Sequence, residues 1–262
     1  MSINLIINKV AERIKDRHLF AIFDRDGTLV PIISDPDRAI LHNDVLELLL
    51  KLDSLPNTRV AILSARDLAQ LRHDFKNNDL ILGGNYGMEL LMPNQMSWIE
   101  PKAVQSRNLL LAAKRELEEQ LPEETQVILE DKQLTLCLHW HLTPSEYREK
   151  VHSCIKLLKT KYSGLLFKAL ATSYEIWPYM QWDKSNGLIQ ITSILKLDLD
   201  ECLILYIGDS DSDEPAFAWV NNRQGITVRV GQSAESIAQF SVKSPKEVKE
   251  ILKLLIANIQ NS

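Results

Sequence analysis

Short apolar segments recur along the chain, and several of them end abruptly in polar residues. The most sharply bounded is Leu19–Phe23, which is followed by Asp24, Asp26 and Gly27. Four or five apolar residues between turn residues predict a buried strand. Four further segments predict strands of the same kind: residues 59–63, 80–82, 202–207 and 226–230, the last being the final strand expected.

Segments with helical spacing lie between these strands. Apolar residues recur every three or four positions over residues 3–16, which predicts a helix before the first strand. Further helices are expected over residues 43–55, 182–195 and 245–259, and Asp67 and the Ser244–Glu247 capping box are helix-start signals. Strands that alternate with helices in this way predict an α/β fold with a doubly wound, mostly parallel sheet.

The pattern changes between residues 101 and 177. A helix is expected over residues 103–121, a hairpin of strands over 127–130 and 133–140, and two more strands over 165–170 and 173–177. Thr143–Glu146 has the form of a capping box, which predicts a helix that continues to about residue 161. We therefore expect a smaller α+β domain at 101–177, inserted into a main domain formed by residues 1–100 and 178–262.

Composition narrows the class of protein. The 262 residues carry a formal net charge of −5 and no long basic run, which argues against a nucleic-acid partner. No apolar run approaches the roughly 20 residues of a membrane span, and charge interrupts the N-terminal segment too early for a signal peptide. The three cysteines are scattered, as is typical of buried thiols in a reducing compartment. We expect a cytoplasmic, monomeric enzyme that acts on a small molecule, although the sequence leaves the oligomeric state open.

Polar side chains follow several of the predicted strands and helix starts: Asp24 and Asp26, Ser64 and Arg66, Lys184, and Asp209 and Asp213. Each has an ordinary explanation taken singly, since acidic turns, surface lysines and solvated loops are common. In open α/β sheets, however, ligands bind at the carboxyl ends of the strands. The combination therefore predicts one site at that edge of the sheet.

These residue types suit the transfer of a phosphoryl group. A carboxylate such as Asp24 can act as the nucleophile, provided that a cation shields it from the phosphate. Mg²⁺ prefers oxygen ligands, which Asp24, the Asp26 carbonyl, Asp209 and Asp213 would supply.

The remaining polar groups complete that chemistry. Lys184 would offset negative charge, and Ser64 would donate a hydrogen bond to a phosphoryl oxygen. Asp26 would protonate the leaving oxygen and later accept a proton from the attacking water.

The same residues resemble the motifs of the haloacid dehalogenase (HAD) superfamily. Asp24 and Asp26 stand at its nucleophile and acid/base positions, Ser64 at the second motif, Lys184 at the third, and Asp209 and Asp213 at the fourth. This resemblance implies a HAD-like core with an inserted cap and an aspartyl-phosphate intermediate.

Longer segments are similar to the trehalose-6-phosphate phosphatases. They are FDRDGTLVPI, LSARDLAQL, GGNYGMEL, LEDKQLTLCLHWH, YEIWPYMQWDKSNGL and IGDSDSDEPAF, in that order. The resemblance implies hydrolysis of trehalose 6-phosphate, with substrate-binding residues at Arg66, Gly87, Glu130, Lys132, His141 and Glu175. Six residues depart from the family pattern: Ala65, Tyr86, His141, Trp177, Ser185 and Ser210.

Several alternatives remain open at this point. The substrate could be another sugar phosphate, such as sucrose 6-phosphate or glucosylglycerol phosphate, or the chain could be a phosphomannomutase-like phosphotransferase. A catalytically silent sugar-phosphate-binding module is the alternative outside the enzymes. His139 and His141 alternate along one strand, but we expect a structural or sugar-facing role for them rather than a metal site.

Overall fold

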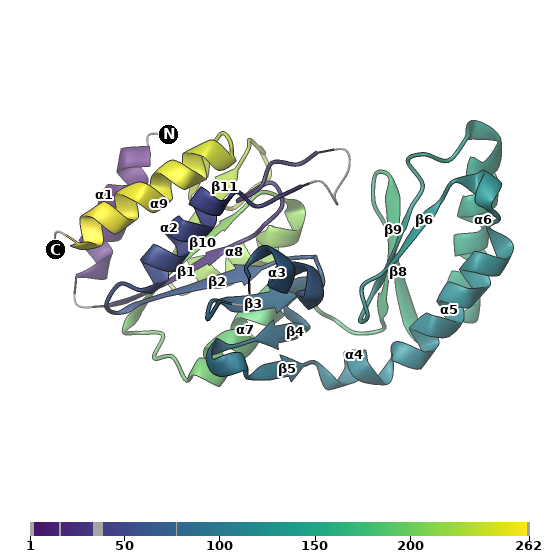
Figure 1. Ribbon diagram of the computed structural model, residues 1–262, viewed down its shortest axis with the longest axis horizontal. Coiled ribbons are helices and arrows are strands. Elements are labelled where there is room, and N and C mark those ends of the chain that lie inside the picture. Colours follow the sequence, from purple (N-terminus) through teal and green to yellow (C-terminus); the bar gives the residue numbers. More distant parts are fainter. Residues whose placement is uncertain (1–2, 16, 34–38, 77, 261–262) are drawn as a thin grey trace. The chain divides into compact units, whose positions relative to one another are not determined.

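The computed structural model describes residues 3–15, 17–33, 39–76 and 78–260. It divides into two compact units, one formed by residues 1–98 and 182–262 and the other by residues 99–181. The borders predicted for the inserted domain, 101 and 177, fall inside the second unit. We describe each unit separately and refer to them as the core unit and the cap unit (Figure 1).

The core unit is built on one eight-stranded sheet, whose order is β12-β11-β10-β1-β2-β3-β4-β5. Its strands are β1 (His18–Phe23), β2 (Thr58–Leu63), β3 (Ile81–Gly84), β4 (Glu89–Leu91), β5 (Ser97–Ile99), β10 (Cys202–Gly208), β11 (Ile226–Val230) and β12 (Phe240–Val242). Its helices are α1 (Ile3–Ile14), α2 (Asn43–Asp53), α3 (Leu68–Asp74), α7 (Lys184–Leu195), α8 (Glu214–Asn221) and α9 (Pro245–Gln260). The strands from β12 to β3 pair in parallel, and β4 pairs with β3 in the antiparallel direction. The predicted α/β class with a mostly parallel sheet is confirmed.

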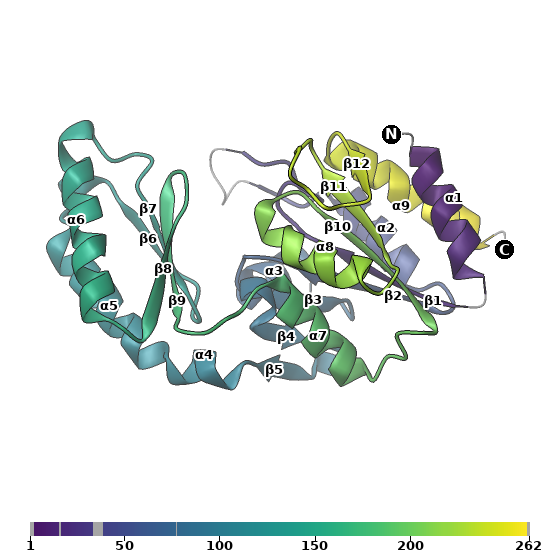
Figure 2. The same cartoon turned by 180° about the vertical axis from the view of Figure 1, so that it is seen from behind.

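Strand β1 lies at the centre of this sheet and is buried on both of its faces. Leu19, Ala21 and Phe23 contribute to one apolar cluster, which the helices α1, α2, α3 and α9 cover. Phe20 and Ile22 contribute to the cluster on the opposite face, beneath α7 and α8 (Figure 2). Burial on both faces explains why the strand is a continuous apolar run rather than an alternating one.

The order of the strands reverses at β1, because β2 follows on one side and β10 on the other. Phe23 pairs with Ile62 of β2 and with Ile207 of β10, so all three strands end at the same level of the sheet. This reversal creates the crevice in which α/β sheets bind their ligands. Asp24 follows its paired position by one residue, and Ser64 and Asp209 each follow theirs by two.

The cap unit has an antiparallel sheet of order β6-β7-β9-β8. Its elements are α4 (Pro101–Gln105), α5 (Arg107–Gln120), β6 (Ile128–Asp131), β7 (Leu136–His139), α6 (Ser145–Lys161), β8 (Leu165–Ala169) and β9 (Ser173–Pro178). Leu136, Leu138 and Ile176 pack with apolar residues of α5 and α6 on one face of the sheet. Because side chains alternate along a strand, Cys137 and its cross-strand neighbours Glu130 and Glu175 lie on the other face.

Several local predictions were wrong. The helix expected over residues 103–121 is two helices, since the chain passes through Ser106 between α4 and α5. The capping box at Thr143 is not formed, because helix α6 begins after Pro144 without a side-chain cap. In the second predicted box, the Glu247 carboxylate accepts a hydrogen bond from the backbone N–H of Lys243 rather than that of Ser244.

Three strands were not predicted, and each has only three residues: β4, β5 and β12, the last of which follows the expected final strand. Such short segments contain too few positions to show an apolar pattern. In the described part of the chain, no helix combines the length and apolarity that crossing a membrane requires.

Candidate active site

Asp24 occupies the first position after β1 and is only 6% exposed. Its backbone N–H donates to the carbonyl oxygen of Ile207 at 2.9 Å, which fixes the residue against the end of β10. The Oδ1 atom accepts a hydrogen bond from the backbone N–H of Arg25 at 2.6 Å, and Oδ2 lies 3.0 Å from Nζ of Lys184. The carboxylate is therefore oriented by two donors at the strand end.

Lys184 is the first residue of α7 and is 1% exposed. Asp183 caps this helix: its carboxylate accepts from the backbone N–H of Ser185 at 2.8 Å. The Lys184 ammonium lies 2.6 Å from Oδ1 of Asp213 as well as beside Asp24. Burial lowers the pKa of Lys184, but the two carboxylates outweigh that effect and raise it above its usual range. The residue is thus a buried, fully charged cation between two acids.

Asp213 lies in the loop after β10 and is completely buried. Its Oδ1 atom accepts from Lys184 and from the Tyr206 hydroxyl at 2.8 Å. Its Oδ2 atom accepts from the backbone N–H groups of Asp209 and Ser210 at 3.1 and 3.0 Å, and from the Ser210 hydroxyl at 3.1 Å. Burial raises the pKa of Asp213, yet the charge and hydrogen bonds around it hold that pKa below its ordinary value. Asp213 is therefore ionised and acts as the anchor of this loop.

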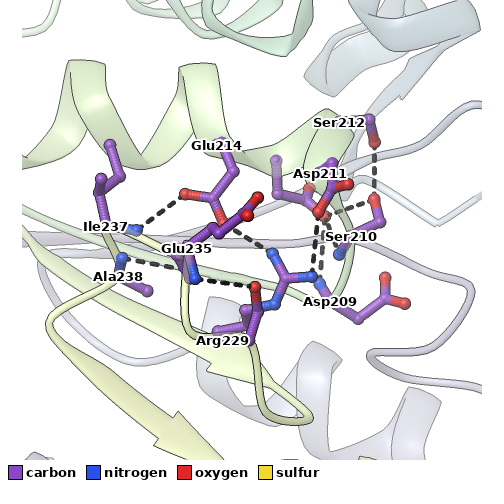
Figure 3. Close-up of polar contacts among 12 residues, drawn as sticks. Asp209, Ser210, Asp211, Ser212, Glu214, Arg229, Glu235, Ile237 and Ala238 are labelled. Atoms are coloured by element: carbon purple, nitrogen blue, oxygen red, sulfur yellow. Dashed lines mark hydrogen bonds and ion pairs between the residues drawn. The ribbon is translucent and has the colours of Figure 1, made fainter.

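Arg229 of β11 braces the same loop from the neighbouring strand (Figure 3). Its guanidinium donates to Glu214 at 2.6 Å and to the exposed Asp211 at 3.3 Å. The other oxygen of Glu214 accepts from the backbone N–H of Ile237 at 3.0 Å. The sequence analysis assigned no role to Arg229, because its partners become evident only when β11 is paired with β10.

Among the described residues, three carboxylates lie together at this edge of the sheet, and two of them, those of Asp24 and Asp213, are buried. Oxygen atoms of Asp24, Asp209 and Asp213 all lie within 4.8 Å of one another, and the Lys184 ammonium is the cation that pairs with two of them. Burial, followed by the Asp213 charge, raises the pKa of Asp209 to about 6, and burial raises the pKa of Asp24 well above its ordinary value. A hard divalent cation would remove this excess of negative charge, so the donor set fits Mg²⁺.

Gly27 allows this cluster to assemble. Its φ is +77°, and a Cβ atom at this position would lie 2.0 Å from Oδ2 of Asp209. A side chain would therefore displace the Asp209 carboxylate, in addition to straining the backbone.

Asp26 has different neighbours from Asp24. Arg25 donates to its Oδ1 atom at 2.5 Å, and Arg66 donates to Oδ2 at 2.7 Å and to Oδ1 at 3.0 Å. Burial raises the pKa of Asp26, but the two guanidinium groups lower it below the ordinary value overall. The structure thus separates the two acids: one faces a lysine and further carboxylates, and the other faces arginines.

Ser64 and Gly87 lie at the ends of β2 and of the turn after β3. Ser64 is 1% exposed, and its hydroxyl accepts from the backbone N–H of Arg66 at 3.2 Å. Gly87 has a φ of +84°, and a Cβ atom there would come within 2.5 Å of the Cα atom of Gly187 in α7. The position of Gly87 thus follows from a close backbone approach that only glycine permits.

Four predicted substrate-binding residues lie in the cap unit. Glu130 and Glu175 flank Cys137 on the polar face of the cap sheet, and the Lys132 ammonium lies 3.7 Å from Oε2 of Glu130. His141 is exposed and follows the end of β7. The structure thus gathers three of the four on one face. The His141 ring lies beside the ring of His139 of β7, with their centroids 6.2 Å apart.

The chain is similar to known proteins over most of its length. A family model described as Trehalose-phosphatase matches residues 22–252. The trehalose 6-phosphate phosphatase RA3 of Zea mays is 28% identical in an alignment of 257 positions, which covers 92% of this chain and 70% of the maize protein. The trehalose-phosphate phosphatase of Mycobacterium bovis is 27% identical in an alignment of 258 positions, which covers 97% of this chain and 65% of that protein.

Solved structures show the same fold. The C-terminal domain of the C. albicans trehalose-6-phosphate phosphatase superposes with a TM-score of 0.77 at 21% identity, covering 98% of this chain and 97% of that one. A haloacid dehalogenase-like hydrolase from Bacteroides thetaiotaomicron gives a TM-score of 0.64 at 14% identity, with 90% and 99% covered. The predicted HAD-like core is therefore confirmed. Since the family model spans nearly the whole chain, the protein belongs to the trehalose-phosphatase family, a family of phosphoric monoester hydrolases.

Proposed function

We propose that this protein hydrolyses trehalose 6-phosphate to trehalose and phosphate, with Mg²⁺ and through a phosphorylated Asp24. The observation that carries the proposal is the buried cluster of Asp24, Lys184, Asp209 and Asp213 at the point where the strand order reverses. A carboxylate that lies beside a lysine and two further acids suits attack on a phosphate, provided that a divalent cation is bound there. Membership of the trehalose-phosphatase family favours trehalose 6-phosphate as the substrate.

In the first half of the reaction, the Asp24 carboxylate attacks phosphorus and the bond from phosphorus to the sugar oxygen breaks. The product on the enzyme is an acyl phosphate, and Asp26 donates a proton to the departing sugar oxygen. Bound Mg²⁺ would neutralise charge between nucleophile and phosphate, held by the carboxylates of Asp24 and Asp209 and by the carbonyl oxygen of Asp26. Asp213 was expected from the sequence to be a further ligand, but we propose that it acts mainly by orienting the loop and Lys184, since its two oxygens already accept the hydrogen bonds described above.

In the second half, water attacks the same phosphorus atom and the bond to Asp24 breaks. Asp26 accepts the proton that this water loses. Its lowered pKa keeps Asp26 deprotonated, so that it can accept a proton, but also makes it a weak base. The pKa would rise, as the acid role requires, if the guanidinium of Arg66 moved from Asp26 toward the substrate. Lys184 stays charged throughout, and the Ser64 hydroxyl would donate to a phosphoryl oxygen.

Specificity for the sugar would come from the cap unit. Carboxylates and an ammonium group can accept from and donate to the many hydroxyls of a disaccharide, and Glu130, Lys132 and Glu175 offer these groups on one polar face. We also propose that the inserted domain spans residues 101–177. Three further residues would bind the substrate, namely Arg66, Gly87 and His141.

The test combines one variant with a substrate screen. Asp24→Asn should lower phosphate release from trehalose 6-phosphate in the presence of Mg²⁺ by at least about a thousandfold, since it removes the nucleophile. Asp200→Asn, at an exposed position, should retain the wild-type rate. After acid quenching during turnover, borohydride reduction should convert Asp24 to homoserine in the wild type, which marks the acyl phosphate.

The screen should include sucrose 6-phosphate and glucosylglycerol phosphate, with and without a sugar bisphosphate. A clear preference for one of these would overturn the trehalose assignment and retain the chemistry. Activity that depends on a bisphosphate would indicate a mutase, and an active Asp24→Asn variant would overturn the mechanism.

A further inference from the structure

The polar face of the cap sheet carries a second group of metal-ligating side chains, distinct from the carboxylates of the core unit. Glu130 of β6 is the direct cross-strand neighbour of Cys137 of β7, and His139 lies two residues farther along β7 on the same face. The ligand atoms of these three side chains, a carboxylate oxygen, a thiol sulfur and an imidazole nitrogen, all lie within 4.8 Å of one another. Cys137 is only 3% exposed, so the sulfur lies at the base of the group.

The spacing of the nitrogen and oxygen ligand atoms matches a tetrahedral metal site. Zinc binds nitrogen and oxygen at about 2.0–2.2 Å and sulfur at about 2.3 Å, which separates tetrahedral ligand atoms by roughly 3.3–3.6 Å. Nε2 of His139 lies 3.3 Å from Oε2 of Glu130, within that range before any adjustment. The strand pairing holds the three side chains in register, so little conformational freedom has to be lost on binding.

The chemistry of the three ligands selects for zinc over magnesium. Thiolate and imidazole are ligands for zinc and similar transition metals, whereas Mg²⁺ requires an octahedral shell of oxygen atoms. The Lys132 ammonium lies 3.7 Å from the Oε2 atom of Glu130. A thiolate and a carboxylate together neutralise a divalent cation, so this lysine does not exclude the metal.

We infer that Glu130, Cys137 and His139 form a zinc site with three protein ligands and an open fourth position. Glu130 is also a proposed contact for the sugar, so the site has a consequence for activity that rests on the proposed function. Zinc at this site takes Glu130 away from the substrate, and it should therefore inhibit sugar-phosphate hydrolysis without displacing Mg²⁺ from the core unit.

The binding test uses Co²⁺ as a spectroscopic probe on the full chain with excess Mg²⁺ present. Binding at the cap site should give thiolate-to-cobalt charge-transfer absorption and the intense visible bands of tetrahedral Co²⁺, and one equivalent of Zn²⁺ should abolish both. Cys137→Ser should lose the charge-transfer band, and His139→Gln should weaken Zn²⁺ binding by at least about tenfold. Cys154→Ser, which alters another buried cysteine of the cap unit, should behave like the wild type.

Absence of the charge-transfer band in the wild type, or its persistence in Cys137→Ser, would overturn the site. Thermal unfolding of each variant establishes that a lost band reflects a lost ligand rather than an unfolded cap.

The inhibition test measures phosphate release at saturating Mg²⁺ while Zn²⁺ is increased. The wild type and Cys154→Ser should be inhibited at the Zn²⁺ concentration that displaces Co²⁺, and Cys137→Ser should be at least about tenfold less sensitive. Equal inhibition of all three would overturn the regulatory conclusion. If no sugar phosphate is hydrolysed at all, the proposed function fails, while the cobalt spectra still decide whether the zinc site exists.

Discussion

Arg25 connects Asp26 to two other segments of the core unit. It stands between the two acids of the D-x-D motif, and nothing in the sequence indicates its partners. The side chain is 1% exposed, and each end of its guanidinium is engaged: Nη1 with Asp26, Nε with Asp74 at 2.6 Å and Nη2 with the carbonyl oxygen of Ala39 at 2.5 Å. Arg25 therefore connects Asp26 to the end of α3 and to the loop that precedes α2.

Replacing Arg25 by Met should destabilise the protein by about 3 kcal/mol at pH 7.5, because it leaves Asp74 and the Ala39 carbonyl without their buried partner. The loss should become smaller only as the pH falls below about 3.8. The lowered pKa of Asp26 stabilises the folded state above the ordinary aspartate pKa of 3.8, and this contribution disappears as the pH falls through the lowered pKa. Urea unfolding at pH 7.5 and at a series of pH values below 4 measures both quantities.

Arg59→Met is the matched control, since the Arg59 side chain is 53% exposed and its pair with Asp53 is long, at 3.4 Å. It should change the free energy of unfolding by no more than about 0.5 kcal/mol. A similar loss of unfolding free energy in both variants would show that the buried contacts of Arg25 stabilise the protein no more than an exposed ion pair does.

At the scale of the element, the start of α7 links a helix cap to the position of Lys184. Asp183 accepts from the backbone N–H and hydroxyl of Ser185 at 2.8 and 2.6 Å, and the Asn186 amide oxygen accepts from the backbone N–H of Asp183 at 2.9 Å. The same helical turn carries Lys184 at its first position. The cap thus sets the direction from which the lysine reaches Asp24 and Asp213.

Asp183→Ala should cost about 1 kcal/mol of stability, the usual value for a lost N-cap. It should also lower kcat at a temperature where the variant is fully folded, because the first turn of α7 frays and Lys184 loses its fixed geometry. Asp183→Ser can still accept from the N–H of Ser185, so it should restore most of both losses. A variant that loses stability but retains kcat would show that the ion pairs alone position Lys184.

The elements also show what the sequence allowed us to predict. Strand β1 was predictable because burial on both faces makes it a continuous apolar run that ends at Asp24. The two predicted capping boxes failed because Ser, Thr and Glu can satisfy the pattern without adopting the geometry. The linkage of Arg229 to Glu214 was not predictable, since nothing in either local segment indicates that β11 lies beside β10.

At the scale of the whole molecule, two sets of residues distant in the sequence have separate proposed roles. The ends of β1, β2 and β10 were predictable as one site because parallel strands end at the same edge of a sheet. The cap residues were predicted through family resemblance, since their common face depends on the register of β6, β7 and β9. His139 illustrates the difference: its partners Glu130 and Cys137 became evident only once the strands were paired.

This separation predicts that cap variants affect the sugar and core variants affect the chemistry. Glu175 is 7% exposed, and its Oε2 atom accepts from Nε1 of Trp177 at 3.1 Å, so Gln retains its size and this hydrogen bond. Glu175→Gln should raise KM for trehalose 6-phosphate by about tenfold, because the carboxylate loses charge-assisted hydrogen bonds to sugar hydroxyls. Its rate with p-nitrophenyl phosphate, which has no sugar, should stay at the wild-type value, whereas Asp24→Asn should lose both activities.

Glu119→Gln, at an exposed position of α5, is the control and should alter neither activity. Equal losses of Glu175→Gln on both substrates would assign Glu175 to the folding of the cap sheet, so the ratio of the two rates distinguishes recognition from structure.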